Sequence, residues 1–523
     1  MSLPVDRGGA ADAAAPLALR QRNMVGVIDI GSNSLRLVLY DRLCRSPKVL
    51  FNEKVMCALG RGLNSTGRLN PEGVVLAREN IERFTMLSRQ LGVGRLDVLA
   101  TSAVRDAQDG PAFVAEIEAR NGIKVTVIDG MREGRLSASG VRAGIPDADG
   151  ITGDLGGGSV ELAITGPQAS GFVTSLPIGP LRLIEGSGDD SKPRAAVDQA
   201  VAGLSWLGQA RGKPFYAVGG TWRTLARMHM EQTGYPLHVI QNYKLHRAEA
   251  ENFLEVISRL SRRSLEKVIG ISRKRLETVP LAAYVLYRLV RTIQPSEVVF
   301  SAFGLREGHL FEQLSLDEQR LDPLLEACRQ MASVEPRFGS GGEELVEWTD
   351  PLFAGETPAQ YRLRRAVALL SDIGWAEHPD YRDEQVFTHC LRMPVPGLDH
   401  AGRVFIAVAL QARYGGDADA AIMTEPRRLL DETDFARART IGLAFRLGYT
   451  LTGGAPMLLG KTSVTLDPLN VALTVPEHTA IYTGEAVQRR LDALGRSLGR
   501  RAIVQTEEAT RPPPAKKRAG RGG

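Results

Sequence analysis

The 523-residue sequence has few cysteines, few aromatic residues and no long apolar run. No apolar stretch reaches the roughly 18–20 residues that a membrane helix needs, so a membrane-spanning protein is not expected. The N-terminus lacks a basic start followed by an unbroken apolar segment, so no signal peptide is predicted. The cysteines are scattered without a CxxC pair, which excludes a disulfide framework or zinc cage and predicts reduced thiols in the cytoplasm; they are Cys44, Cys57, Cys328 and Cys390.

The net charge of +5 comes from the two ends of the chain. Residues 511–523 hold five basic residues and no acid, and residues 1–22 carry a net charge of +1, so the chain between them is nearly neutral. A protein that binds nucleic acid through a general basic character is therefore not indicated. Both ends are rich in Ala, Gly and Pro without periodicity, which predicts disordered arms over 1–22 and 511–523.

The remaining chain divides into three blocks by its pattern of strands and helices. Strands and helices alternate over residues 23–145 and again over residues 146–312, which is typical of α/β domains. Residues 313–510 are mainly helical, with a short strand-rich piece at 462–475 before a last helix. The predicted organisation is therefore α/β, α/β and then mainly α.

A short motif occurs twice in the same register. Residues 29–37 read DIGSNSLRL and residues 154–162 read DLGGGSVEL, so Asp, an apolar residue, Gly, Ser and Leu recur 125 residues apart. In each copy a strand enters a Gly- and Ser-containing turn and continues as a second strand. One unit used twice predicts two similar α/β domains that face each other across a cleft.

The two turns contain the donors that an anion site needs. Glycine lets backbone N–H groups approach an anion, and serine hydroxyls add donors. Ordinary hairpin turns have the same composition, but two copies in register favour phosphate binding, and the strand–turn–strand pattern differs from Walker and Rossmann loops. The residue seven positions after the leading Asp is Arg36 in the first copy and Glu161 in the second. An arginine suits a phosphate oxygen, and a glutamate suits Mg²⁺ or water.

Further segments are expected at the same cleft. Thr101 and Arg105 follow a strand. The Gly-Gly-Thr sequence at 219–221 leads into a helix with Arg223 in its first turn. Free N–H groups at the start of a helix favour an anion. Glu133 begins another helix and is a candidate general base. Taken singly, these features have ordinary alternatives: a surface ion pair, a glycine-rich helix start and a helix-capping acid.

Together the segments resemble the exopolyphosphatase / guanosine pentaphosphate phosphohydrolase (Ppx/GppA) family of the actin-like phosphotransferase superfamily. The resemblance covers residues 24–312 and rests on the ordered motifs VIDIGSNSLRLVL, LATSAVRDAQ, IDGMREGRL, GDLGGGSVEL, VGGTWRTLA and SAFGLREG. It implies two actin-like (ribonuclease H-like) α/β domains, then a mainly helical HD-like domain, in a homodimer. It also implies an enzyme closest to exopolyphosphatase, which releases terminal phosphate from inorganic polyphosphate with Mg²⁺.

The resemblance implies roles for individual residues. Glu133 matches a catalytic base that orients water for in-line attack, and Asp154 and Glu161 match acids that hold Mg²⁺ and help to place that water. Positioning and charge neutralisation are what phosphoryl transfer mainly requires. With Thr101 and Arg223 added from the segments above, the predicted phosphate-binding set is Ser32, Asn33, Ser34, Arg36, Thr101, Arg105, Gly156, Gly157, Gly158, Ser159, Gly219, Gly220, Thr221 and Arg223.

The helical block departs from the HD-type metal site that it resembles. Ser371 stands where the first histidine of the His-Asp pair would be, and the nearby histidines are His378, His389 and His400. A metal site that lacks its first imidazole is not expected. This block is therefore predicted to be a scaffold, a dimer contact or a polyanion groove.

Several functions remain open at this point. Exopolyphosphatase and guanosine pentaphosphate 5′-phosphohydrolase share all the motifs, and Arg-rich runs at 259–275 and 362–365 favour the long polyanion unless they are simply solvated helix faces. A catalytically silent polyphosphate- or nucleotide-binding regulator would be expected to lack Glu133 or Asp154, and both are present. An actin-like sugar kinase or chaperone ATPase would need an adenosine pocket, and the segment after Ala100 fits the phosphatases better. No membrane or specific nucleic-acid partner is expected.

Overall fold

The chain forms two compact units in the computed structural model. The structure describes residues 23–166, 171–184, 191–266, 275–334, 337–338, 342–477 and 482–506. The first unit contains the described residues up to Ala327 together with Val395–His400, and the second contains the described remainder. Both predicted arms lie outside the described residues. None of the described helices combines the length and the apolar character needed to cross a bilayer.

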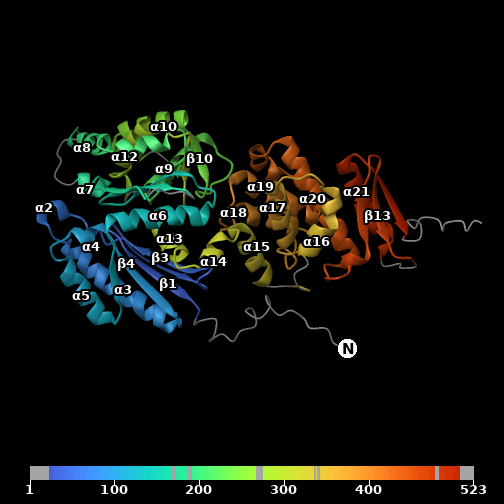
Figure 1. Cartoon of the computed structure of the whole chain (residues 1–523), viewed down its shortest axis with the longest axis horizontal. Helices are drawn as coiled ribbons and strands as arrows, with labels where there is room; N and C mark the ends of the chain where they lie inside the picture. Colours follow the sequence, from blue (N-terminus) through green and yellow to red (C-terminus); the bar gives the residue numbers. More distant parts are fainter. Residues whose placement is uncertain are drawn as a thin grey trace, which may run out of the picture. The chain divides into compact units, whose positions relative to one another are not determined.

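The first unit begins with a five-stranded sheet in the order β3-β2-β1-β4-β5 (Figure 1). β2 lies antiparallel between β1 and β3, and β4 and β5 run parallel to β1. The strands are β1 (Val25–Ile30), β2 (Leu35–Tyr40), β3 (Val49–Val55), β4 (Arg95–Ala100) and β5 (Val125–Val127). The helices of this region are α2 (Leu63–Thr66), α3 (Pro71–Gln90), α4 (Ser102–Asp106) and α5 (Gly110–Asn121).

A six-stranded sheet follows, in the order β10-β11-β9-β6-β7-β8. β6 and β7 form an antiparallel hairpin, and β9 and β11 run parallel to β6. The strands are β6 (Gly150–Leu155), β7 (Val160–Thr165), β8 (Val173–Leu176), β9 (Phe215–Val218), β10 (Tyr243–His246) and β11 (Glu297–Phe300). The helices are α7 (Pro180–Ile184), α8 (Ser191–Ala202), η1 (Ser205–Ala210), α9 (Trp222–Thr233), α10 (Arg247–Arg259), α11 (Arg262–Leu265) and α12 (Val279–Ile293).

The repeated motif forms the same hairpin in both sheets. Asp29 lies opposite Arg36 in the β1–β2 pair, and Asp154 lies opposite Glu161 in the β6–β7 pair. Each hairpin also has a parallel strand beside its first strand, β4 in one sheet and β9 in the other. The predicted pair of similar α/β domains is therefore confirmed.

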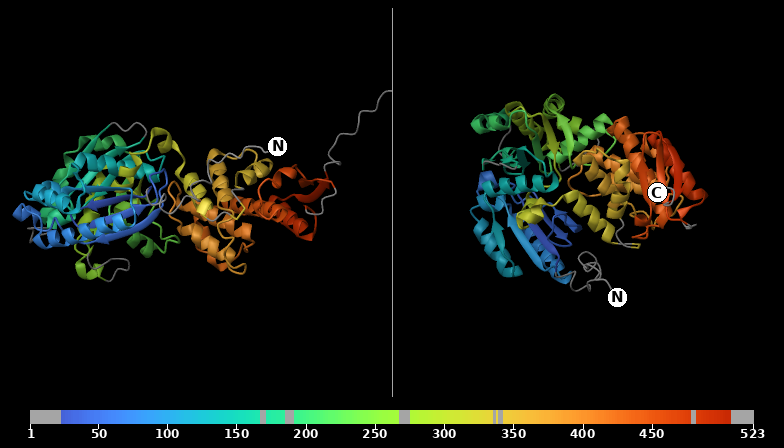
Figure 2. Two further views of the ribbon diagram at one scale, coloured as in Figure 1. Left: turned by 90° about the horizontal axis from the view of Figure 1, so that it is seen from below. Right: turned by 45° about the vertical axis from the view of Figure 1, so that its right-hand side comes forward.

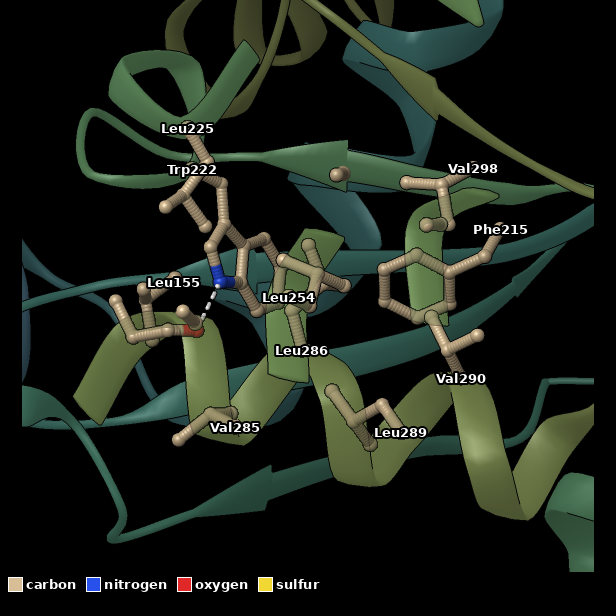
Figure 3. Close-up of a cluster of buried hydrophobic side chains, with 14 of the residues drawn as sticks. Leu155, Phe215, Trp222, Leu225, Leu254, Val285, Leu286, Leu289, Val290 and Val298 are labelled. Carbon is tan, nitrogen blue, oxygen red and sulfur yellow. Dashed lines mark hydrogen bonds between the residues drawn. The ribbon is translucent and has the colours of Figure 1, made fainter. Parts of the chain in front are cut away.

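Trp222 organises the core of the second sheet. Its buried indole Nε1 donates a hydrogen bond to the carbonyl oxygen of Ala282 at 2.9 Å (Figure 3). Phe215 meets the indole edge-on with ring centroids 5.9 Å apart, and Leu286 of α12 belongs to the same cluster. A buried indole needs a partner for its N–H group, so this bond fixes the start of α9 against α12. The glycine-rich loop just before α9 is thereby held at the end of β9.

Helices α6 (Gly130–Gly144) and α13 (Leu305–Phe311) pack against each other. α6 also contacts β6, β7 and β8 of the second sheet. On the other side, Leu310 of α13 and Leu136 of α6 join an apolar cluster of the first sheet, together with Val25, Val27, Val38, Tyr40, Leu99 and Ile128. The two helices therefore connect the two sheets.

The α6–α13 crossing is a contact of backbone on backbone. A Cβ atom at Gly308 would lie 1.8 Å from the carbonyl oxygen of Leu136, and one at Gly140 would lie 2.0 Å from the carbonyl oxygen of Gly304. Contacts this short leave no room for any side chain. Glycines at the crossing therefore fix the distance between α13 and α6, the helix whose first turn holds Glu133.

The second unit is mainly helical and ends in a three-stranded sheet, β12-β13-β14, on which α21 packs (Figure 2). Its strands are β12 (Ser463–Leu466), β13 (Asn470–Val475) and β14 (Arg501–Thr506). Helix α14 (Leu316–Arg320) lies before it, within the first unit. The helices from there on are α15 (Pro323–Val334), α16 (Gly342–Thr349), η3 (Asp350–Leu352), α17 (Pro358–Leu369), α18 (Arg382–Arg392), α19 (His400–Tyr414), η4 (Ala421–Met423), η5 (Pro426–Leu429), α20 (Glu432–Thr452), η6 (Leu459–Lys461) and α21 (Glu485–Leu498).

Some local expectations differ from the structure. The edge strands β3 and β14 were not predicted, because half-exposed strands with several polar residues lack a clear apolar pattern. The segment after Ala100, expected as a loop, forms the short helix α4 with Thr101 at its N-cap. The first unit, which holds the five-stranded and six-stranded sheets, continues through α14 to Ala327.

In the second unit, Ser371 and Asp372 stand at the position of the His-Asp pair of an HD-type site, and Asp372 belongs to an ion-pair cluster. The Ser371 hydroxyl donates to the carbonyl oxygen of Val367 at 2.8 Å. Asp372 lies 3.2 Å from Arg337 and 3.6 Å from Arg413. Two guanidinium groups thus neutralise the aspartate that would serve a metal in an HD-type site.

Candidate active site

The turns of the two hairpins close in the same way. In each turn the glycine N–H donates to the serine carbonyl oxygen three residues later at 3.0 Å, from Gly31 to Ser34 and from Gly156 to Ser159. The carbonyl oxygen of Ser32 in the first turn also accepts from Gly60 N at 2.8 Å. Both turns are therefore closed and rigid before any ligand arrives.

The two turns lie against each other although they belong to different sheets. A Cβ atom at Gly157 would lie 3.3 Å from Ser32 Cβ, and one at Gly158 would lie 3.1 Å from Ser102 Oγ. Ser32 and Ser102 share a hydrogen bond of 2.8 Å. A small pocket opens between them, lined by Ser32, Gly60, Leu63, Asn64, Ser102, Ala103, Gly157, Gly158, Leu181 and Arg182. Of the residues predicted to bind phosphate, Ser32 of the first domain thus lies beside Gly157 and Gly158 of the second.

The third predicted loop begins α9. Gly219 has φ of 111° and a Cβ there would lie 2.5 Å from the carbonyl oxygen of Leu155, so only glycine fits. Thr221 is the N-cap residue, and its side chain makes no capping hydrogen bond. The backbone of the loop does part of the capping instead, since Arg223 N donates to the carbonyl oxygen of Gly219 at 3.1 Å and Thr224 N donates to that of Thr221 at 2.9 Å.

Glu133 lies in the first turn of α6 and is 7% exposed. Asp129, not Glu133, caps this helix, since its carboxylate accepts from Arg132 N at 2.7 Å. Arg105 Nη1 lies 3.4 Å from Glu133 Oε2. Burial raises the pKa of Glu133 well above its usual range, and the charges of Glu161 and Asp154 raise it further, whereas Arg105 lowers it.

Asp154 and Glu161 lie opposite each other on β6 and β7. Asp154 accepts a hydrogen bond from the Ser137 hydroxyl, and burial raises its pKa. Glu161 accepts from Ser175 Oγ at 2.8 Å through Oε1, and burial raises its pKa to about 7. Its buried Oε2 has no hydrogen-bond partner among the described residues.

These carboxylates suit a divalent cation. Glu133 and Glu161 are buried and Asp154 is half-buried, and the charge of Asp154 raises the pKa of both glutamates, a repulsion that a cation would relieve. Within the described ranges, no three His, Cys, Asp or Glu side chains form a closed metal cluster. Mg²⁺ usually takes one or two carboxylates and completes its shell with water and substrate phosphates. The donor set of Asp154 and Glu161 fits that pattern.

The raised pKa of Glu161 predicts a pH-dependent cost to stability in the metal-free protein. Its folded-state value of about 7 exceeds the ordinary 4.5, so the folded state loses stability relative to the unfolded state as pH rises from 4.5 to 7. We expect Glu161→Gln to melt a few degrees higher than the wild type at pH 8 in EDTA, and equally near pH 4.5. Thermal unfolding at both pH values measures this, and equal curves at pH 8 would contradict it.

A charged network lies beside the carboxylates. Arg306, at the start of α13, is 3.9 Å from Asp29 and 3.8 Å from Glu307. The Tyr40 hydroxyl donates to Glu307 at 3.3 Å. Burial raises the pKa of Asp29, and Arg306 and Arg36 lower it. The leading Asp of the first motif is therefore paired with Arg306, and the charges of Arg223 and Arg306 also lower the pKa of Asp154, the leading Asp of the second motif.

Four cations from the two sheets come close together. Arg36 on β2 lies opposite Lys54 on β3, Arg223 lies in the first turn of α9, and Arg275 donates to the carbonyl oxygen of Gly220. Burial lowers the pKa of Lys54 to about 8, and the charges of Arg275, Arg36 and Arg223 lower it further. Cations that destabilise one another in this way form a site for a multiply charged anion.

Some of these residues were not predicted. Asp29 could have been found from its register with Asp154, and Arg306 from its place in the SAFGLREG segment. Lys54 gave no signal because β3 itself was not predicted, and Arg275 was seen only as part of a basic run. Of that run, Lys267, Arg273 and Lys274 lie outside the described residues.

The Arg362–Arg365 run does not supply a set of free cations. Arg364 is 1% exposed and pairs with Asp350 at 2.6 Å and with Glu356 at 2.5 Å. Arg365 pairs with Glu343 at 2.6 Å. The run therefore gives no support to a polyanion groove, because carboxylates 8 to 22 residues away in the sequence neutralise two of its three arginines.

Known proteins are similar to this chain over both units. Exopolyphosphatase 1 of Mycobacterium tuberculosis is 26% identical over 306 residues, covering 55% of this chain and 88% of that protein. Guanosine-5′-triphosphate,3′-diphosphate pyrophosphatase of Photobacterium profundum is 24% identical over 408 residues, covering 74% of this chain and 80% of that protein. The crystal structure of an exopolyphosphatase from Cytophaga hutchinsonii matches with 25% identity and a TM-score of 0.50, covering 55% of this chain and 96% of that one.

Two family models match consecutive parts of the sequence. The model of the C-terminal part of exopolyphosphatase matches residues 324–504. The model of the Ppx/GppA phosphatase family matches residues 38–317, which hold the second motif copy, Glu133 and the third loop. Since that match spans more than half of the chain, the protein belongs to the Ppx/GppA phosphatase family.

Proposed function

We propose that this protein is an exopolyphosphatase, which hydrolyses the terminal phosphoanhydride bond of inorganic polyphosphate. The observation that carries the proposal is the convergence of two buried glutamates, from α6 and β7, and the half-buried Asp154 of β6 beside two facing turns from different sheets. Anion-binding turns beside buried acids suit the hydrolysis of a phosphate ester or anhydride.

The two turns and the third loop would hold the terminal phosphates. Ser32, Asn33 and Ser34 would contact the phosphates from one side, Gly156 to Ser159 from the other, and Gly219 to Thr221 from the start of α9. Arg36, Lys54, Arg223 and Arg275 would neutralise the charges of the phosphates that follow. A substrate with several adjacent charges uses this cation cluster fully.

Glu133 would serve as the general base. Its carboxylate accepts a proton from the attacking water as the water oxygen bonds to the terminal phosphorus. The bridging P–O bond breaks, and the shortened chain leaves with the electron pair of that bond. Arg105, 3.4 Å away, favours the ionised form of Glu133 before the reaction. Bound at Asp154 and Glu161, Mg²⁺ would neutralise charge on the phosphate oxygens.

Polyphosphate ranks above guanosine pentaphosphate as substrate because four cations from two sheets suit a chain of equivalent phosphates. The nucleotide remains the alternative, since relatives named for each activity are of similar identity. We further propose that the protein acts in the cytoplasm as a homodimer and needs no membrane or nucleic acid.

The test compares phosphate release from long-chain polyphosphate and from guanosine pentaphosphate, each with Mg²⁺ or EDTA. We expect faster release from polyphosphate, with little release in EDTA. A preference for the nucleotide would establish the alternative substrate. Binding of both compounds without release would identify a silent regulator instead of an enzyme.

A further inference from the structure

An ion pair joins the two α/β domains at the edge of the cleft. Arg182 on α7, in the second domain, lies 2.5 Å from Asp106 Oδ2 at the end of α4, in the first domain. Asn64 of α2 donates to the carbonyl oxygen of Arg182 at 2.8 Å. α7 lies beside α2 and α4 in Figure 1, in agreement with these contacts.

On the second-domain side, α7 is fixed to the phosphate-binding turn. Leu181 N donates to the carbonyl oxygen of Gly157 at 3.0 Å, and Gly179 N donates to that of Gly158 at 3.2 Å. A Cβ atom at Gly179 would lie 2.3 Å from the carbonyl carbon of Gly158. With no space between them, Arg182 and the turn must move as one piece.

On the first-domain side, Asp106 is bonded to the arginine that touches the proposed base. Arg105 Nε donates to Asp106 Oδ1 at 3.1 Å, so the two oxygens of one carboxylate hold two arginines. Arg105 Nη1 donates to the carbonyl oxygen of Ile128 at 3.1 Å and lies 3.4 Å from Glu133 Oε2. A continuous chain of contacts thus runs from Gly157 through Arg182, Asp106 and Arg105 to Glu133.

We propose that Asp106 and Arg182 are positioning residues for the hydrolysis proposed above, on which this inference rests. Docking of the second phosphate-binding turn brings Arg182 to Asp106, and the shared carboxylate then holds the Arg105 guanidinium beside Glu133. The base is therefore assembled only when the turn that carries substrate is in place. A partly exposed ion pair contributes little to stability, so the expected effect is on turnover rather than on folding.

The experiment measures kcat and KM for polyphosphate in Arg182→Gln, Asp106→Asn and the double variant. Each single change should lower kcat about tenfold with KM within about threefold of the wild type, since the broken ion pair lies away from the bound phosphates. The double variant should be no slower than the worse single variant, because either change alone already disconnects the turn from Arg105. Arg182→Lys, which keeps the charge, should recover part of the loss.

The control is Arg78→Gln. Arg78 also pairs with a carboxylate at 2.5 Å, that of Glu116, with comparable exposure, but within the first domain alone. It should leave kcat unchanged, and thermal unfolding should show every variant folded. The inference is overturned if the single changes stay within twofold of an active wild type, or if their effects on kcat multiply in the double variant. A wild type inactive on both phosphate substrates would instead refute the proposed function and this inference with it.

Discussion

Replacing Glu133 with glutamine is expected to lower the rate of phosphate release by about 10²–10⁴-fold, the usual contribution of a positioned general base. Glutamine keeps the size of the side chain in this buried position but cannot accept a proton from water. Because bound phosphates are proposed to contact the turns and the cation cluster and not Glu133, polyphosphate binding should persist. Phosphate release measures the first effect, and equilibrium binding of polyphosphate measures the second.

The matched control is Glu79→Gln, on the exposed face of α3. It changes the same net charge in the same domain and should leave both turnover and binding at wild-type values. Full activity in Glu133→Gln would refute the assignment of the base. A loss of binding in parallel with turnover would show that Glu133 holds the site together instead of moving a proton.

Replacing Asp154 with asparagine should remove the response to Mg²⁺ and slow turnover by about 10²-fold or more, as expected when a metal that neutralises phosphate charge is lost. The half-buried carboxylate accepts from Ser137, and asparagine can keep that hydrogen bond through its amide oxygen. The variant should therefore fold, but its neutral side chain is a much poorer ligand for a hard cation.

A second readout does not depend on catalysis. A cation that binds only the folded wild type raises its melting temperature with concentration. This Mg²⁺-dependent rise should be much smaller in Asp154→Asn and unchanged in Asp149→Asn, which removes an exposed carboxylate paired with Lys213 near the start of the same strand. An equal rise in Asp154→Asn would place the metal elsewhere.

The hairpins and their opposing acids could be predicted from the sequence because their geometry is local. In an antiparallel hairpin the spacing along the chain decides which residues face each other, so Asp154 and Glu161 had to meet once the turn was recognised. The same holds for Asp29 and Arg36. The two copies in register then implied that two domains would present the same turn.

The charged partners could not be predicted in the same way, because they depend on contacts between distant segments. Lys54 reaches the site on an edge strand whose polar residues obscure its pattern, and Arg306 arrives on α13. Arg364 is an example of the opposite error. Its place in a basic run suggested a free cation, but in the structure it is paired with Asp350 and Glu356. The sequence gives the sign of each charged side chain but not the residue with which it pairs.

Helix α13 has a consequence for the synthesis of the chain. Leu310 covers the same face of the first sheet as Val25 and Val27, residues translated almost three hundred codons earlier. Until the ribosome has passed Phe311, that face exposes apolar side chains, because contacts between such distant segments form late. The first α/β domain is therefore synthesised before the helix that completes its apolar face. That helix, α13, has only seven residues.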